Sequence, residues 1–144
     1  MSAETVRDAM VPEPTTLAAT ANAQEAGRCF ADSGEVRAIF VTEDDGRLVG
    51  VVTRKTLVRE VVAAGLEPAA VSLRAIAEPP NFTLDAGLGL EGAFRFLEEQ
   101  DLERVPVVEQ GGRLVGVLSR AVVQRRLAED EPPDGEQQPD SLVL

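Results

Sequence analysis

Two short apolar runs, each interrupted by one glycine, dominate the pattern of apolar and polar residues along the chain. The first run, Arg47–Arg54, has the sequence RLVGVVTR, and the second, Arg113–Arg120, has the sequence RLVGVLSR. Runs of four to eight apolar, β-branched residues between turn residues are typical of buried strands. The glycine indicates a bulge or a point where another segment approaches the backbone closely. Asp45-Gly46 and Gly111-Gly112 precede the runs, so each run is expected to follow a hairpin turn.

The remaining pattern predicts the same series of elements twice. In a helix at 54–64, Leu57, Val58, Val61 and Val62 fall on one face and form an apolar stripe. The first series is a short helix at 5–11, a strand at 15–18, a helix at 21–33, a strand at 37–41, the first glycine-interrupted strand and the helix at 54–64. The second series is a helix at 72–77, a strand at 81–84, a helix at 88–100, strands at 104–108 and 113–118, and a helix at 119–128.

The chain therefore contains an internal repeat. A shift of about 67 positions aligns most of its two halves, which is the signature of a duplicated structural unit. Of the 14 lysine and arginine residues, 12 fall into six matched pairs. Two interpretations are open: the pairs are a relic of duplication, or some of them do the same task twice around a pseudo-two-fold axis. The pairs are Arg7 with Arg74, Arg28 with Arg95, Arg37 with Arg104, Arg47 with Arg113, Arg54 with Arg120, and Arg59 with Arg125.

These observations predict an α+β fold in which two pseudo-symmetric β-α-β-β-α repeats pack as one module. Residues 5–64 are expected to form the first repeat, residues 65–71 the linker and residues 72–128 the second repeat. A repeat of about 60 residues is near the size at which a separate core becomes marginal, so the halves should share an interface. Residues 129–144 contain six acids and no base, and this composition predicts a disordered acidic tail.

Composition and charge argue against several classes of partner and compartment. The net charge of −11 and the absence of Trp and Tyr argue against nucleic-acid binding, which depends on cations and stacking side chains. No apolar stretch approaches 18 residues, so no membrane span is expected. The N-terminus lacks the basic and apolar regions of a signal peptide. A single cysteine, Cys29, permits no intrachain disulfide and favours a cytoplasmic location.

The sequence also argues against catalysis. There is no histidine, which excludes His-ligated metals and histidine general bases. Cys29 lies on the predicted amphipathic helix at 21–33 and is expected to belong to the core. The acids are scattered without metal-ligand spacing. We therefore expect a protein that is not an enzyme and that holds no metal.

Three features of the repeat resemble the cystathionine β-synthase (CBS) domain, which occurs in tandem pairs called Bateman modules. The resemblance covers about residues 5 to 128. Its features are the opening helix around Val6–Met10, the strand Arg104–Val108 with its partner Arg37–Val41, and the Gly-x-x-hydroxyl steps Gly50–Thr53 and Gly116–Ser119. Their double occurrence at a fixed offset is the strongest part of this resemblance.

The resemblance implies a regulatory module with two clefts between the repeats, which in many members hold AMP, ADP, ATP or S-adenosylmethionine. The hydroxyls of Thr53 and Ser119 would contact phosphate. The matched Arg37 and Arg104 would also meet phosphate, in a charge-assisted contact. Ala38, Ile39, Val105 and Pro106 would cover the base, and the residues after each hydroxyl, Arg54, Lys55, Thr56 and Arg120, would complete the ligand sites.

One departure from the family distinguishes the two clefts. Nucleotide-binding members carry an aspartate three residues after the hydroxyl, where it holds the ribose diol, whereas this chain has Thr56 and Val122. A lost hydrogen bond to a charged acceptor costs about 1.5–3 kcal/mol, so by this criterion the Thr53 side is the better candidate and Lys55 adds a cation there. The Ser119 side would be empty or would bind a compound without a ribose.

Two functional hypotheses remain open. The first is a stand-alone regulatory module that senses a small ligand, an adenine nucleotide or a related adenosyl compound, and acts on an unidentified protein. The second is a structural or protein-interaction module with degenerate pockets. A homodimer is expected under either hypothesis, because a single Bateman module often pairs with another.

Overall fold

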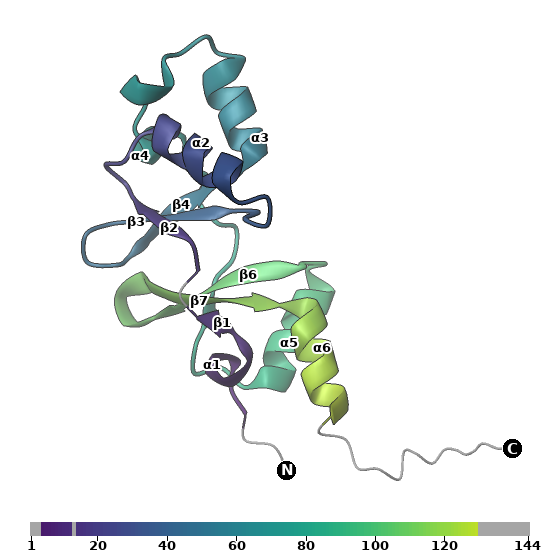
Figure 1. Ribbon diagram of the computed structural model, residues 1–144. Helices are drawn as coiled ribbons and strands as arrows, with labels where there is room; N and C mark the ends of the chain where they lie inside the picture. The colour runs from purple at the N-terminus through teal and green to yellow at the C-terminus, as the bar shows by residue number, and fades with distance from the viewer. Residues whose placement is uncertain (1–3, 13, 130–144) are drawn as a thin grey trace, which may run out of the picture.

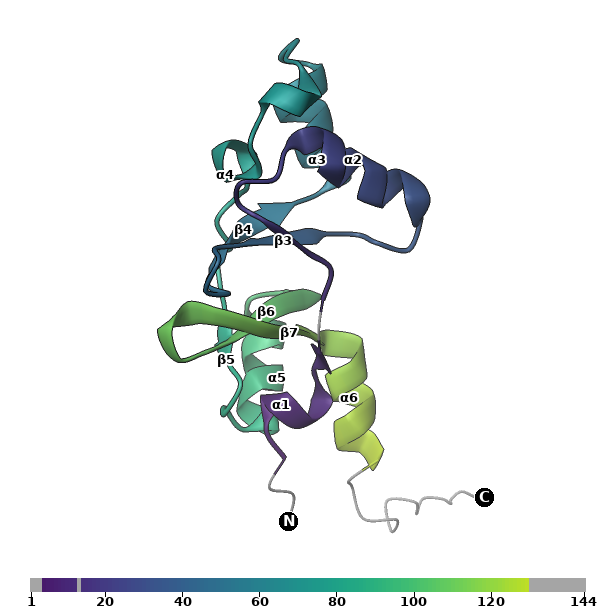
Figure 2. The same cartoon turned by 60° about the vertical axis from the view of Figure 1, so that its left-hand side comes forward.

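The computed structural model describes residues 4–12 and 14–129. The described chain forms two halves, each a small sheet with helices on its outer face, and the two sheets face one another across the middle of the molecule (Figures 1 and 2). No helix in these residues is long and apolar enough to cross a membrane. The expected α+β architecture of two pseudo-symmetric repeats is confirmed.

The first half contains a three-stranded sheet in the order β2-β3-β4. Strand β2 (Thr16–Ala18) runs parallel to β3 (Ile39–Thr42), and β3 forms an antiparallel hairpin with β4 (Leu48–Val52). The helices of this half are α2 (Ala23–Asp32), α3 (Arg54–Leu57) with its π-helical continuation η1 (Val58–Val62), the short η2 (Pro68–Ala70) and α4 (Leu73–Ile76).

The second half contains a four-stranded sheet in the order β1-β7-β6-β5. Its central hairpin joins β6 (Arg104–Glu109) to β7 (Arg113–Ser119) through η3 (Gln110–Gly112), while β5 (Leu84–Asp85) runs parallel to β6. The fourth strand, β1 (Val11–Pro12), pairs antiparallel with β7. The helices of this half are α1 (Val6–Ala9), α5 (Leu90–Glu99) and α6 (Arg120–Glu129).

The two repeats exchange their first helices. Helix α1 opens the first repeat, yet Val6 and Ala9 are buried in the core of the second half with Leu97 and Leu118. Helix α4 opens the second repeat, yet its Leu73 is buried in the core of the first half. Each packing unit therefore combines segments of both repeats, which joins the halves more firmly than a shared face alone.

The two strand glycines mark close approaches, as expected. A Cβ atom on Gly50 would lie 2.7 Å from the carbonyl oxygen of Glu78, and one on Gly116 would lie 2.8 Å from that of Val11. The register of each hairpin also shifts opposite these glycines, between Val41 and Thr42 and again between residues 107 and 108. Bulge and close approach thus occur together, because the exchanged segment packs against the bulged strand.

The matched arginines Arg7 and Arg74 do the same structural task twice. Each lies on an exchanged helix and forms an ion pair with a glutamate at the end of a hairpin strand, Arg74 with Glu43 and Arg7 with Glu109. The Arg74 guanidinium donates two hydrogen bonds to the Glu43 carboxylate, at 2.6 and 2.7 Å. These hydrogen bonds lower the pKa of Glu43 below its ordinary value. The interpretation that some pairs repeat one task is therefore correct for this pair.

The structure corrects two of the sequence-based predictions. Val61 is buried, but Val58 and Val62 are 58% and 70% exposed, because the predicted apolar stripe is wider than the sheet covers and the helix becomes π-helical at Val58. Glu129, the first residue of the predicted tail, is the last residue of α6. The remainder of that predicted tail, 130–144, lies outside the described residues.

Candidate ligand clefts

A cleft of about 630 Å³ lies between the two sheets and is lined by both repeats. We call it the Ser119 cleft. The first repeat contributes the segment before β3 and the connection from β1 to β2, and the second repeat contributes β6, the end of β7 and the start of α6. Its lining residues are Val11, Pro14, Thr15, Ser33, Glu35, Val36, Arg37, Ala38, Phe40, Val51, Arg104, Val105, Pro106, Val117, Ser119 and Val122.

None of the six polar side chains that line the Ser119 cleft has a hydrogen-bond or ion-pair partner among the described residues. They are Thr15, Ser33, Glu35, Arg37, Arg104 and Ser119. Arg37 and Arg104 both line the cleft, one from each repeat, and neither appears in any of the ion pairs or side-chain hydrogen bonds of the described chain. The hydroxyl of Ser119 likewise forms no hydrogen bond there. Two unpaired guanidinium groups and a free hydroxyl at the start of α6 are suited to an anion.

Apolar groups form the other part of this cleft. Pro106 on β6 and the half-buried Ala38 before β3 line it, and Val105 borders it although its side chain is 2% exposed and belongs to the core of the second half. These small, flat surfaces suit a planar ring. Ile39, the fourth residue expected to cover a base, is instead fully buried in the core of the first half. The reason is the alternation of side chains along β3, which directs neighbouring residues to opposite faces of the sheet.

The matched cleft on the opposite side of the pseudo-two-fold axis is much smaller, at about 210 Å³. We call it the Phe82 cleft. Phe82 stands at the position that Thr15 holds in the Ser119 cleft, and its ring packs edge-on against Phe96 with centroids 5.2 Å apart. Arg104, Val105 and Pro106 line both clefts. The larger side chain at residue 82 therefore reduces the space on this side.

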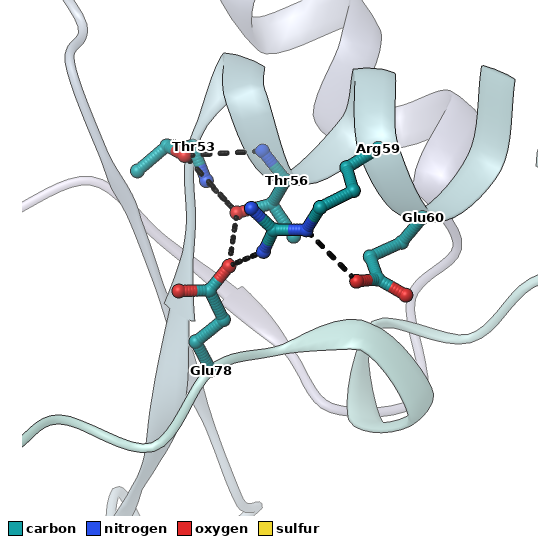
Figure 3. Close-up of polar contacts among 5 residues, drawn as sticks. All are labelled: Thr53, Thr56, Arg59, Glu60 and Glu78. Carbon is teal, nitrogen blue, oxygen red and sulfur yellow. Dashed lines mark hydrogen bonds and ion pairs between the residues drawn. The ribbon is translucent and has the colours of Figure 1, made fainter. Parts of the chain in front are cut away.

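The Thr53 side, which is the region around the start of α3, contains a network of hydrogen bonds and ion pairs within the protein (Figure 3). The hydroxyl oxygens of Thr53 and Thr56 lie 3.0 Å apart, and the Thr53 hydroxyl accepts from the Thr56 backbone N–H. Thr56 is 1% exposed, and its hydroxyl donates a hydrogen bond of 3.2 Å to the Glu78 carboxylate. Arg59 pairs with the same carboxylate and with Glu60, and both contacts raise the pKa of Arg59 above its ordinary value. Thr53 and Thr56 are thus bound within the protein.

Arg54 and Arg120, which the sequence placed in the ligand sites, contact the loop that follows the long helix of their half. The Arg54 guanidinium donates to the carbonyl oxygens of Val36, Phe30 and Ser33 at 2.7, 3.1 and 3.3 Å. It also lies over the Phe30 ring, 4.8 Å from its centroid. The matched Arg120 pairs with Glu103 at 2.6 Å. Both arginines therefore fasten the loop between the long helix and the hairpin in their half.

Lys55 lies in a third, open pocket of about 540 Å³ on the surface of the first half. Thr53, Arg54 and Arg37 line the same pocket, so Arg37 borders both this pocket and the Ser119 cleft. Of the expected site residues, the structure thus brings Arg37, Ala38, Arg104, Val105, Pro106 and Ser119 together in one cleft.

Sequence reasoning missed several residues of the Ser119 cleft. Val11, Pro14 and Thr15 enter it because β1 pairs with β7 of the other repeat, and no local pattern predicts that exchange. Glu35 contributes the one carboxylate among the lining residues. The resemblance identified Arg37, and Glu35 lies only two residues before it, so this proximity in sequence could have indicated that Glu35 lines the cleft.

Two similar halves with a cleft between them define a paired-repeat module. The chain belongs to the CBS domain family, whose family model matches residues 6–63 and again residues 73–129. This match confirms the family that the repeated motifs indicated.

Hypoxic response protein 1 of Mycobacterium tuberculosis is 32% identical over 95 residues, which are 66% of this chain and 66% of that protein. Its crystal structure superposes with a TM-score of 0.72 at 28% identity, covering 85% of this chain and 98% of the other. That structure contains two coordinated zinc ions. Within residues 4–12 and 14–129 of the present chain, no group of three or more His, Cys, Asp or Glu is placed to hold a metal.

Two further similarities concern nucleotides. The structure of CBSX2 in complex with AMP, a protein of Arabidopsis thaliana, superposes with a TM-score of 0.67 at 25% identity and covers 87% of this chain and 96% of the other. Inosine-5'-monophosphate dehydrogenase of Mycobacterium tuberculosis is 33% identical over 79 residues, which are 55% of this chain but only 14% of the enzyme. Such a partial match assigns no catalytic activity to this chain.

Proposed function

We propose that the protein is a regulatory, non-catalytic module that binds an adenine nucleotide or a related adenosyl compound in the Ser119 cleft. The observation that carries the proposal is the pair of unpartnered arginines, Arg37 and Arg104, that two different repeats direct to one cleft. Unpaired cations gathered beside an apolar surface match a ligand with an anionic group and a planar ring.

The cleft suggests how such a ligand is held. The phosphate, or the charged group that replaces it, meets Ser119 and Arg104 near the start of α6, where backbone N–H groups add a favourable dipole. The ring lies against Ala38 and Pro106. The complex of CBSX2 with AMP supports the adenosyl class. This assignment favours the Ser119 side over the Thr53 side, because the Phe82 cleft is smaller and the hydroxyls of Thr53 and Thr56 are already bonded within the protein.

A ligand in this cleft contacts both repeats and can therefore bias their relative arrangement. It does so only to the extent that it binds one arrangement more tightly than another. The target of this regulation is an unidentified protein. A cytoplasmic location, inferred from the single cysteine, stays a prediction.

Combining Arg104→Gln with Ser119→Ala is expected to weaken binding of the best ligand by about tenfold or more, since each change removes a contact to a charged group. Isothermal titration calorimetry with AMP, ADP, ATP and S-adenosylmethionine measures the effect. Arg95→Gln is the matched control, because Arg95 is exposed on α5 and lies outside the cleft. If none of the four compounds binds the wild-type protein, or if the double variant binds equally well, the proposal is wrong.

We also propose that two copies associate through the helices of the first half. A groove of about 360 Å³ lies between α2 and η1, and the adjacent Val58, Val62 and Leu66 are 58%, 70% and 50% exposed. Large apolar groups exposed side by side are typical of an interface. In the second half, Phe94 and Leu127 stand at the positions of Gly27 and Val61 and pack against the core.

Val62→Glu is accordingly expected to convert a dimer into a monomer, because it places a charge in the apolar interface. Sedimentation velocity measures the mass of the particle. Ala128→Glu, at the matched position of α6, should leave the dimer intact. A monomeric wild-type protein, or a dimer that survives Val62→Glu, contradicts this interface. If adenosyl compounds do not bind but the dimer forms as described, the module functions in protein interaction.

A further inference from the structure

The matched arginines Arg59 and Arg125 have different surroundings. On the Thr53 side, Arg59 forms an ion pair with the carboxylate of Glu78, which also accepts from the Thr56 hydroxyl (Figure 3). On the Ser119 side, Arg125 is exposed and has no ion pair or side-chain hydrogen bond with another described residue. The duplication therefore supplies the same guanidinium twice, with an anionic partner on one side only.

The backbone around the two arginines is equivalent. Residues 53, 56 and 59 match residues 119, 122 and 125, with the same spacing after the hydroxyl. Glu78 pairs with Val51 on β4, just as Val11 pairs with the matched Val117 on β7. Val11 and Val122 both line the Ser119 cleft. Because residues three apart on a helix share a face, Arg125 follows Val122 along α6, just beyond the residues that line the cleft.

We propose that the ligand of the Ser119 cleft carries a second anionic group, which Arg125 binds at the place that the Glu78 carboxylate occupies beside Arg59. This inference rests on the proposed adenosyl function and narrows its ligand class. The first anion meets Ser119 and Arg104. The second lies against Val11 and Val122, which stand at the positions that Glu78 and Thr56 hold on the Thr53 side, where Glu78 pairs with Arg59 and accepts from the Thr56 hydroxyl.

The residues Val11 and Val122 favour a ligand with a second anionic group over a ligand with an unmodified sugar diol. An acidic residue at position 122 would accept two sugar hydroxyls and would repel a phosphate, whereas Val122 does neither. Arg125 offers up to two parallel N–H donors to a phosphate or a carboxylate, which is a strong charge-assisted contact. On the Thr53 side of the molecule, the equivalent position beside Arg59 is occupied by the carboxylate of Glu78. The ligand class that fits is an adenosine with a 5'-phosphate and a further phosphate on its 2' or 3' oxygen.

The test compares AMP with adenosine 2',5'-bisphosphate and adenosine 3',5'-bisphosphate by isothermal titration calorimetry. One of the bisphosphates is expected to bind the wild-type protein about tenfold or more tightly than AMP, the gain of one added charged contact. Arg125→Gln should remove this preference and leave the affinity for AMP unchanged. Arg59→Gln is the matched control and should alter neither affinity. Val122→Asp should shift the preference back toward AMP by adding a repelling carboxylate.

The same measurements distinguish a failure of the second-anion inference from a failure of the proposed adenosyl function. If AMP binds as tightly as both bisphosphates, the second anion is wrong and the proposed function stands. If Arg125→Gln weakens AMP and the bisphosphates equally, while circular dichroism shows that the variant is folded, Arg125 does not act on a second anion. If no adenosine compound binds, the proposed function fails and this inference fails with it.

Discussion

Replacement of Leu73 by alanine is expected to lower the free energy of unfolding by about 2–5 kcal/mol, the range for a fully buried leucine. Leu73 belongs to the second repeat in sequence, yet its side chain is 0% exposed in the core of the first half. The cavity should therefore loosen the first half. Chemical denaturation measures the free energy, and amide hydrogen exchange should show lower protection in β3 and β4 than in β6 and β7.

Val6→Ala is the matched experiment for the other exchanged helix. Val6 opens the first repeat but is fully buried in the core of the second half. The pattern of protection should reverse, with the larger loss in β6 and β7. If each substitution instead loosens the half that contains its own repeat, the exchange of α1 and α4 is wrong.

Gly50→Ala is expected to lower the free energy of unfolding by about 1–3 kcal/mol, because the added methyl group overpacks a tight contact. Its Cβ would lie 2.7 Å from the Glu78 carbonyl oxygen and 3.0 Å from the Ala77 Cβ. The first of these neighbours is backbone, so β4 and the segment that follows α4 must move apart. Thermal or chemical denaturation measures the loss.

Gly92→Ala serves as its control. Gly92 lies inside α5, away from the proposed dimer groove, and a Cβ there would meet no atom within 4 Å. Alanine should therefore raise the free energy of unfolding by about 0.5–1 kcal/mol, through its better helix propensity. An equal loss of stability in both variants would contradict the close approach at Gly50.

Much of the fold was predictable because its signals are local. The glycine-interrupted runs became β4 and β7, and the turns before them became hairpins with Gly46 at φ 91° and Gly111 at φ 75°. The double occurrence of these patterns also indicated the CBS domain family. The exchange of α1 and α4 was not predictable in this way, because short helices of similar sequence fit either core by their own pattern.

The candidate site was predictable only in part. The resemblance pointed to Arg37, Arg104 and Ser119, and these line one cleft. It pointed equally to Arg54, whose guanidinium donates to three backbone carbonyl oxygens. Nothing in the spacing of the arginines distinguishes these two outcomes. The partner of a long side chain depends on which loop lies within its reach.

The sequence by itself determined the duplication, the strands and hairpins of each half, and the family. These follow from periodicity, turn residues and repeated motifs, which act over a few neighbouring positions. The tertiary structure alone decided which helix packs in which core, which arginines stay unpaired, and which cleft is open. Glu78 and Phe82 show the reason: each lies far along the chain from Thr53 and Thr56, and only folding brings them to that side of the molecule. Single residues at matched positions thereby make two nearly equivalent halves chemically different.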